Sequence, residues 1–154
     1  MNVEQVLIPT KVAKAGMTVR EFFKECSDAN TPGLPFCDDS GLITGRVTVK
    51  NILKRSCLPE YLVEMARILG EQISNVQDME AVAKQLLKEP AELYVQAPHI
   101  SLTSKSSAIK ALAMMEHGDT SYIFVVDGGQ YKGVVTIHCL ADKLAHYVHP
   151  SGDI

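Results

Sequence analysis

The chain has 154 residues, of which 46% are hydrophobic, and its formal net charge is −3. This composition supplies a core for one compact domain or for two small intertwined repeats, and it argues against a disordered chain. The weak negative charge provides no general attraction to nucleic acid, although a small basic cleft can exist within an acidic protein.

The amino terminus and the cysteines indicate the compartment. Residues 1–5 have neither the basic flank nor the apolar run of a signal peptide, and no apolar stretch approaches the roughly 20 residues of a membrane span. The four cysteines show no CxxC spacing and stand at 26, 37, 57 and 139. We therefore expect a cytoplasmic protein with reduced, buried thiols and no membrane contact.

The first half of the chain predicts five elements. Thr18 to Glu21 match a capping box, which marks the start of a helix, and the helix ends at Asn30-Thr31-Pro32-Gly33. In chain order we expect a short strand, this helix, two strands joined by an acidic glycine-containing turn, and a second helix, at 11–15, 18–30, 34–37, 42–47 and 49–55.

Residues 58–94 lie between the halves and carry two amphipathic stretches. One stripe is formed by Leu62, Met65, Ala66 and Leu69, and the other by Ala81, Val82, Leu86 and Leu87. The second stripe begins after a possible cap at Asp78 and ends before Pro90. Apolar faces need partners, so we expect two helices that pack against the repeats or against a second subunit.

The second half repeats the order of the first. Ser106 or Ser107 caps a helix that runs through Glu116, and Pro150 stops the last helix. The other expected elements are a strand, two further strands and the final helix, at 100–103, 122–126, 133–136 and 138–148. Each half is therefore a β-α-β-β-α unit in which both helices can cover one sheet face.

An internal repeat connects the halves, with residues 34–51 corresponding to 123–139. At an offset of 88, the first copy's Gly41, Gly45, Val47 and Thr48 match Gly129, Gly133, Val135 and Thr136. At an offset of 89, the helical stripe Val19, Phe22, Phe23 and Cys26 matches Ala108, Ala111, Leu112 and Met115. The hairpin has gained or lost one residue, and the duplication predicts two units that pack on each other.

The residues that carry the repeat are Leu34-Pro35-x-x-Asp38, a glycine-containing turn, and Gly45-x-x-Thr48-x-x-Asn51. This pattern resembles a tandem pair of cystathionine-β-synthase-type (CBS) domains, a Bateman module, over about residues 6–148. The resemblance implies an α/β (α+β) fold in which two β-α-β-β-α repeats pack around a pseudo-twofold axis. The implied boundaries are 1–57 for the first motif, 58–94 for inserted helices and 95–154 for the second motif.

The resemblance also implies two ligand clefts between the units. Adenosyl ligands occupy such clefts in the family: AMP, ADP, ATP or S-adenosylmethionine. Thr48 and Thr136 would offer hydroxyls to phosphate. The contacts near adenine would come from Thr31, Pro32, Gly33, Thr120, Ser121 and Tyr122, and the remaining wall from the first strands around Thr10-Lys11 and His99-Ile100.

Thr48 and Thr136 have an independent physical reason to bind anions, because each begins a helix. Unpaired N–H groups and the positive end of the helix dipole favour a phosphate there. The alternative is ordinary N-capping by the same hydroxyls.

Two positions depart from the family pattern, which has an acidic ribose-binding residue three after the Thr. This chain has Asn51 and Cys139 there. An ionised acceptor contributes roughly 1.5–3 kcal/mol, a neutral one about 1 kcal/mol, and a thiol is a poor acceptor. The cleft with Thr48 and Asn51 is therefore the better nucleotide candidate.

Three basic side chains flank these positions. Lys50 and His138 could each meet a phosphate, although their helical positions favour solvent. Arg46 is expected to point off the sheet, where it could serve a dimer contact.

The carboxy-terminal residues His138, Asp142, His146 and His149 have a spacing compatible with a metal site, but a solvated polar face is the simpler interpretation. No nucleophile elbow, Walker loop or dinucleotide-binding glycine motif is present in the sequence.

We therefore expect a non-catalytic regulatory module, with no required cofactor and no metal, that binds an adenosyl ligand. The alternative is a CBS-fold interaction protein with degraded sites, and a small metal-dependent enzyme is a third reading. The expected partners are a second copy of the chain and a separate effector protein, without nucleic acid.

Overall fold

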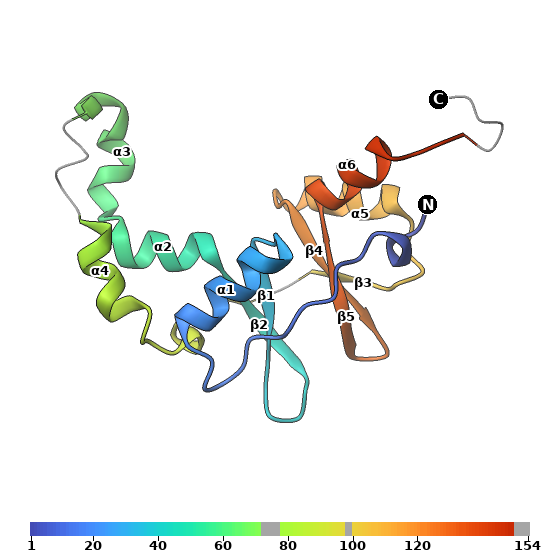
Figure 1. Cartoon of the computed structure of the whole chain (residues 1–154), viewed down its shortest axis with the longest axis horizontal. Helices are drawn as coiled ribbons and strands as arrows, with labels where there is room; N and C mark the ends of the chain where they lie inside the picture. Colours follow the sequence, from blue (N-terminus) through green and yellow to red (C-terminus); the bar gives the residue numbers. More distant parts are fainter. Residues whose placement is uncertain (72–77, 98–99, 150–154) are drawn as a thin grey trace.

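The computed structural model describes residues 1–71, 78–97 and 100–149, and it shows two small α/β units joined by a helical arm (Figure 1). In the first unit, β1 pairs with β2 in antiparallel fashion. Its elements are α1 (Val19–Ala29), β1 (Gly33–Cys37), β2 (Ile43–Thr48) and α2 (Val49–Cys57). The predicted order of this half is confirmed from α1 onward.

The second unit holds a three-stranded sheet in the order β3-β4-β5. The β3 strand runs parallel to β4, and β4 runs antiparallel to β5. Its elements are β3 (Ser101–Leu102), α5 (Ala108–His117), β4 (Tyr122–Asp127), β5 (Gln130–Thr136) and α6 (Ile137–Ala145). The two units have the predicted α/β organisation, and the fold class is confirmed.

Side-chain caps start the helices of both units. The Thr18 hydroxyl accepts a hydrogen bond from the Glu21 backbone N–H at 3.2 Å. Ser107, rather than Ser106, caps α5 through the Lys110 N–H at 3.0 Å. Asn30 ends α1 in the left-handed conformation, with φ of 52°. Local chemistry of this kind can be read from a few neighbouring residues.

Two local expectations are wrong. The strand expected at 11–15 is a single bridge, in which the Ala13 N–H donates to the Pro35 carbonyl oxygen at 2.9 Å. The Lys11 N–H donates instead to the Glu25 carboxylate at 2.8 Å. Helix α6 ends at Ala145, short of the expected residue 148, and the next residue, His146, leaves the helical conformation with φ of −103° and ψ of 10°.

The predicted helical stripe of the second unit is also incomplete. Leu112 is 45% exposed, whereas its neighbours on the stripe, Ala111 and Met115, are fully buried.

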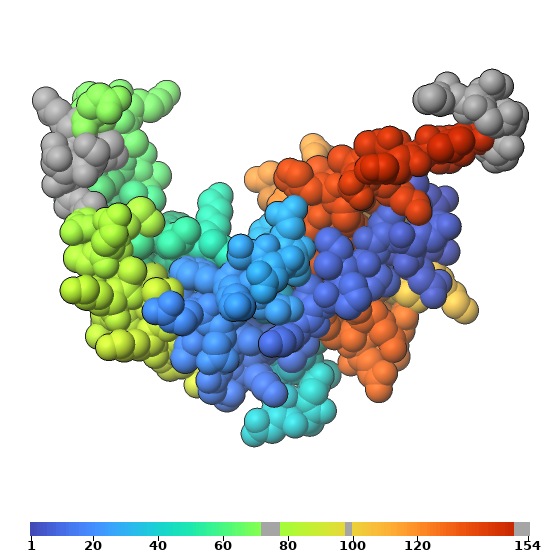
Figure 2. Space-filling model, viewed as in Figure 1, coloured from blue at the N-terminus to red at the C-terminus, as the bar shows by residue number. Residues whose placement is uncertain are grey.

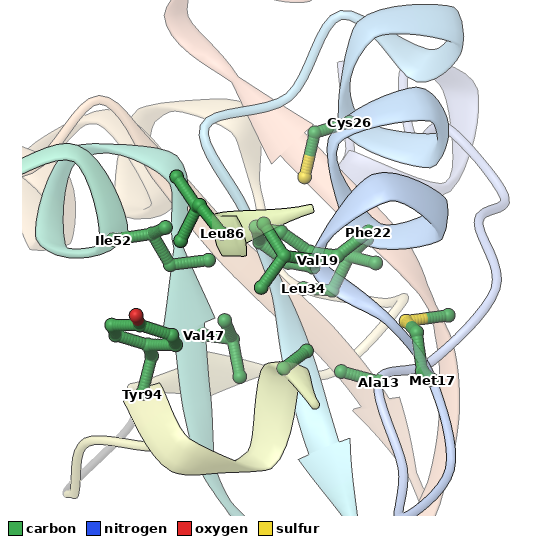
Figure 3. Packing of buried hydrophobic residues seen from close by; sticks show 11 residues of the cluster. Ala13, Met17, Val19, Phe22, Cys26, Leu34, Val47, Ile52, Leu86 and Tyr94 are labelled. Atoms are coloured by element: carbon green, nitrogen blue, oxygen red, sulfur yellow. The ribbon is translucent and has the colours of Figure 1, made fainter. Parts of the chain in front are cut away.

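Each unit encloses its own hydrophobic core. In the first unit, side chains from α1, β1, β2, α2, α4 (Met79–Leu86) and the 3-10 turn η3 (Ala91–Tyr94) converge (Figure 3). The second core contains Val3, Val6, Leu102, Ala111, Met115, Ile123, Val125, Val135 and Leu140. Residues from outside each β-α-β-β-α unit therefore complete its core.

Two entry segments are exchanged between the units. The 3-10 turn η1 (Val3–Gln5) and the residues after it pack on the second unit, where Ile8 exchanges two backbone hydrogen bonds with Val134, at 2.8 and 2.9 Å. The segment after η3 packs on the first unit, where Gln96 exchanges two such bonds with Arg46, at 2.7 and 2.8 Å. These pairs are related by the repeat offset of 88, so the pseudo-twofold relation extends to both segments.

The helical arm consists of α3 (Glu60–Leu69) and α4 (Met79–Leu86), and Asp78 caps α4 as predicted. Leu86 of α4 is buried in the first core. Of the ten residues of α3, Leu62 is the one that is buried, and Met65 of the predicted stripe is 40% exposed. The arm therefore leaves apolar surface uncovered by its own chain.

Within the described ranges, no helix combines the length and apolar character needed to cross a bilayer.

Candidate functional site

A cleft of about 600 Å³ lies between the two units. The beginning of α2 forms one wall, and the turn between α5 and β4 of the other unit forms the opposite wall. The polar and charged lining residues are Arg46, Thr48, Lys50, Asn51, Lys54, Gln96, Glu116, Asp119, Thr120, Ser121 and Tyr122. The fold thus brings residues about 70 positions apart into one site, which we call the first cleft.

Thr48 stands at the N-terminus of α2 and caps it by accepting the Asn51 backbone N–H at 3.1 Å. No acidic residue occupies the first turn of this helix. The positive end of the helix dipole therefore faces the cleft without a local carboxylate to offset it.

Arg46, Lys50 and Lys54 add three cationic groups to the first cleft, opposite the carboxylates of Glu116 and Asp119. Arg46 was expected to point off the sheet, where it could serve a dimer contact, and the structure places it in the lining of the first cleft. The cause is the exchanged segment: Gln96 pairs with the backbone of Arg46 and places this strand position at the cleft wall.

Asn51 is tied to the exchanged segment as well. Its side-chain amide donates to the Tyr94 carbonyl oxygen at 3.3 Å. The Tyr94 hydroxyl in turn donates to the Glu89 carboxylate at 2.8 Å, and the Arg55 guanidinium lies 4.8 Å from the Tyr94 ring centroid. The orientation of Asn51 is therefore set by a contact across more than 40 residues of sequence.

The second cleft is related to the first by the repeat and measures about 510 Å³. Its lining residues are Gln5, Val6, Leu7, Ile8, Asn30, Thr136, His138, Cys139, Asp142 and Lys143. Thr136 is almost fully buried and caps α6 through the Cys139 N–H at 3.0 Å. The Cys139 Sγ lies 3.1 Å from both the N and the O of Thr136, so the thiol turns back on the helix start.

The sequence-predicted residues fall into four groups. The first cleft gathers Pro32, Thr48, Lys50, Asn51, Ile100, Thr120, Ser121 and Tyr122. The second cleft contains Thr136 and Cys139. His99 lies outside the described residues.

Three predicted residues line neither cleft within the described chain, namely Lys11, Thr31 and Gly33. The Thr31 hydroxyl is buried and donates to the Gly33 carbonyl oxygen at 3.1 Å. Gly33 lies beneath the Tyr122 hydroxyl of the other unit, which a β-carbon on Gly33 would approach to 3.0 Å. The lack of a side chain on Gly33 therefore lets Tyr122, a residue of the first cleft, approach the first unit closely.

Sequence reasoning missed the exchanged segments and the residues they bring. Gln96 lines the first cleft and Gln5 to Ile8 line the second. A signal was available, because Ile8 and Gln96 are separated by the same offset of 88 as Gly45 and Gly133. Extending the repeat upstream of the helices would have placed both segments at related positions.

The carboxy-terminal polar residues lie on a surface helix. The Nδ1 atom of His146 is 3.6 Å from the Asp142 carboxylate, and both side chains are more than three-quarters exposed. Within the described chain, no group of three or more His, Cys, Asp or Glu side chains is arranged to hold a metal ion.

Known proteins were compared with this chain by family model and by sequence. The model of the CBS domain family matches residues 91–146. A search of curated proteins finds no significant match.

Three solved structures with this fold illustrate the likeness. The CBS domain of a membrane protein from Sphaerobacter thermophilus is 21% identical, with 92% of this chain and 86% of that chain covered and a TM-score of 0.64. CBSX2 in complex with AMP is 16% identical, with 94% and 96% covered and a TM-score of 0.58. The CBS domain pair of MJ0100, in complex with methylthioadenosine and S-adenosylmethionine, is 16% identical, with 94% and 96% covered and a TM-score of 0.61.

Proposed function

We propose that this protein is a non-catalytic regulatory module, because the model of the CBS domain family matches residues 91–146 and the chain shares the fold of a solved CBS domain pair. Its ligand is an adenosyl compound: AMP, ADP, ATP or S-adenosylmethionine. The ligand binds in the first cleft. Two of the structurally similar proteins hold compounds of this class, which supports the proposal.

The observation that carries the proposal is the composition of the first cleft. The helix N-terminus at Thr48, the ammonium group of Lys50 and the amide of Asn51 face the Thr120–Tyr122 segment of the other unit. Small-molecule sites typically measure about 300–1,000 Å³, and the cleft volume falls within that range.

The walls match the parts of a nucleotide. Phosphate is attracted by the start of α2 and by Lys50. With the Asn51 NH₂ group turned to Tyr94, the side-chain carbonyl is the group that can accept a ribose hydroxyl. Pro32 and Ile100, which line the same cleft, supply apolar surface for adenine. A neutral ribose acceptor contributes about 1 kcal/mol where an ionised one contributes roughly 1.5–3 kcal/mol, so we expect modest affinity.

The features of the second cleft are those of a degraded ligand site. The Cys139 thiol is engaged with the backbone of Thr136, and Val6 and Leu7 of the entry segment line the same space. We therefore propose one nucleotide per chain. The degraded second cleft is also the observation that favours the alternative function, a CBS-fold interaction protein. That alternative requires that the first cleft binds no ligand either.

The proposed output is a change in the relative orientation of the two units. A ligand that contacts both walls of the first cleft stabilises the orientation to which it binds more tightly. We propose that the module acts as a homodimer and passes this change to a separate effector protein. Its four free cysteines fit a reducing compartment such as the cytoplasm.

Thr48→Val is expected to weaken adenosyl-ligand binding about tenfold, because the change removes the hydroxyl at the anion site. Isothermal titration calorimetry with AMP, ADP, ATP and S-adenosylmethionine measures the effect. Thr18→Val is the matched control, since Thr18 caps α1 in the same unit and lines neither cleft. The proposal fails if no adenosyl compound binds at millimolar concentration, or if both variants bind equally well.

Asn51→Asp is expected to tighten ligand binding while making the unliganded protein less stable. The carboxylate is a stronger ribose acceptor, but it cannot donate to the Tyr94 carbonyl, and a lost hydrogen bond of this kind costs about 1–3 kcal/mol. Calorimetry and denaturant unfolding separate the two effects. Cys139→Ser is the control in the second cleft, and an equal gain in affinity there would contradict the inequality of the clefts.

A further inference from the structure

An apolar groove of about 1,220 Å³ lies between the arm and the helices of the first unit. It adjoins both clefts, sharing Pro32, Lys50, Lys54 and Ser121 with the first and Asn30, Thr136 and His138 with the second. Figure 2 shows a hollow between the arm and α6, and the labels of Figure 1, drawn in the same view, place it on the side of α2 that faces away from the hairpin turns. Its apolar lining consists mainly of Phe23, Leu53, Leu58, Leu62, Val63 and Met79. A groove of this size and character marks an interaction surface.

The arm beside the groove exposes large apolar side chains that its own chain does not cover. Tyr61, Val63 and Met79 are all more than half exposed, and Ile68 is 80% exposed. A ten-residue helix is only marginally stable in water without tertiary packing. Helix α3 buries Leu62 alone, so its stability calls for a partner on the exposed face.

The charges at the edge of the groove and on the arm indicate which partner would fit the groove. Lys50 and Lys54 stand on the rim of the groove and are exposed, together with Arg55 of the same helix. The arm helices carry exposed carboxylates at Glu60, Glu64 and Glu80 and exposed cations at Arg67 and Lys84, so that carboxylates outnumber cations on the arm. One chain therefore presents both an apolar groove with a cationic rim and an apolar arm with anionic flanks.

We infer that the groove is occupied by the α3–α4 arm of a second copy of this chain. In a twofold contact the same surface serves both subunits, so each arm enters the groove of the other and the complementary pair is formed twice. The inference rests on the homodimer suggested under the proposed function and specifies its surface. Arm exchange covers the apolar face of α3 and places opposite charges together at the rim.

The test is self-association of the full chain, measured by sedimentation equilibrium without nucleotide, because Lys50 and Lys54 also line the first cleft. Val63→Glu introduces a carboxylate into the groove and is expected to raise the dimer dissociation constant at least tenfold. Leu42→Glu is the matched control: Leu42 is 58% exposed against 56% for Val63, and it lies in the β1–β2 turn. Circular dichroism verifies that both variants fold.

Glu64→Lys tests the charge pairing independently of the apolar contact. It is expected to weaken the dimer and to reduce the loss of affinity that added salt causes in the unaltered protein. A dimer that withstands Val63→Glu, or that Leu42→Glu disrupts equally, overturns the assigned surface while leaving the homodimer in place. An unaltered chain that is monomeric at all concentrations overturns both the surface and the homodimer, but not nucleotide binding, which calorimetry measures separately.

Discussion

Gly133→Ala and Gly45→Ala are each expected to lower the free energy of unfolding by about 2–4 kcal/mol. A β-carbon on Gly133 would lie 2.5 Å from the Ile8 carbonyl oxygen, and one on Gly45 would lie 2.6 Å from the Gln96 carbonyl oxygen. Both obstacles are backbone atoms of the exchanged segments. The substitution therefore has to displace a segment rather than a flexible side chain.

Displacement of either segment has two costs. The paired backbone hydrogen bonds between Ile8 and Val134, or between Gln96 and Arg46, are lost. The buried apolar residues on the same segment, Val3 in one case and Tyr94 in the other, are drawn from their cores. Gly45→Ala should also disturb the first cleft, because Gln96 forms part of its wall.

Denaturant unfolding of the two variants measures these effects, with Thr44→Ala and Lys132→Ala as controls. Each control changes an exposed residue next to the glycine and is expected to shift stability by no more than about 0.5 kcal/mol. Glycine variants as stable as their controls would show that the segments do not hold the units in the described arrangement.

Stability is expected to fall steeply between pH 10 and pH 12, because two tyrosines at the contact between the units resist ionisation. Burial raises the pKa of Tyr131 and that of Tyr122 from 10.0 to about 12. The Tyr131 hydroxyl lies 2.7 Å from the Thr10 hydroxyl, and the ring packs edge-on against Phe124, with centroids 6.0 Å apart.

The direction of the pH dependence follows from the number of protons bound by the folded and unfolded chains. Above pH 10 the unfolded chain loses its phenolic protons while the folded chain keeps them, so the free energy of unfolding falls as pH rises. The stability is fully present below pH 10 and is lost as pH rises through about 12, at up to about 1.4 kcal/mol per pH unit for each tyrosine. Burial likewise raises the pKa of Cys26 from 9.0 to about 12, which starts the loss near pH 9.

Tyr131→Phe is expected to reduce the slope of stability against pH by one tyrosine's share, about 1.4 kcal/mol per pH unit between pH 10 and pH 12. The variant also loses about 1 kcal/mol at neutral pH with the Thr10 hydrogen bond, so the slope is the informative quantity. Urea unfolding across this pH range measures it, with Tyr147→Phe as the control for removal of an exposed phenol. An unchanged slope in Tyr131→Phe would contradict the argument.

The local elements could be predicted because their causes lie within a few residues. Thr18, Thr48, Ser107 and Thr136 each cap a helix through the N–H three positions later. The repeat of glycines and apolar stripes also predicted two similar units that pack on each other. These features depend on backbone hydrogen bonds and side-chain periodicity, which recur wherever the same short pattern occurs.

The tertiary structure alone decided which segment completes which unit. It placed Arg46 in the first cleft, turned the Asn51 amide to Tyr94, folded the Cys139 thiol back on Thr136 and left α3 largely exposed. Each of these depends on surfaces brought together from distant parts of the chain, and the pairing of Ile8 with Val134 spans nearly its whole length. A periodic pattern shows that a face must be buried, but the partner that buries it is selected by the packing of the complete fold.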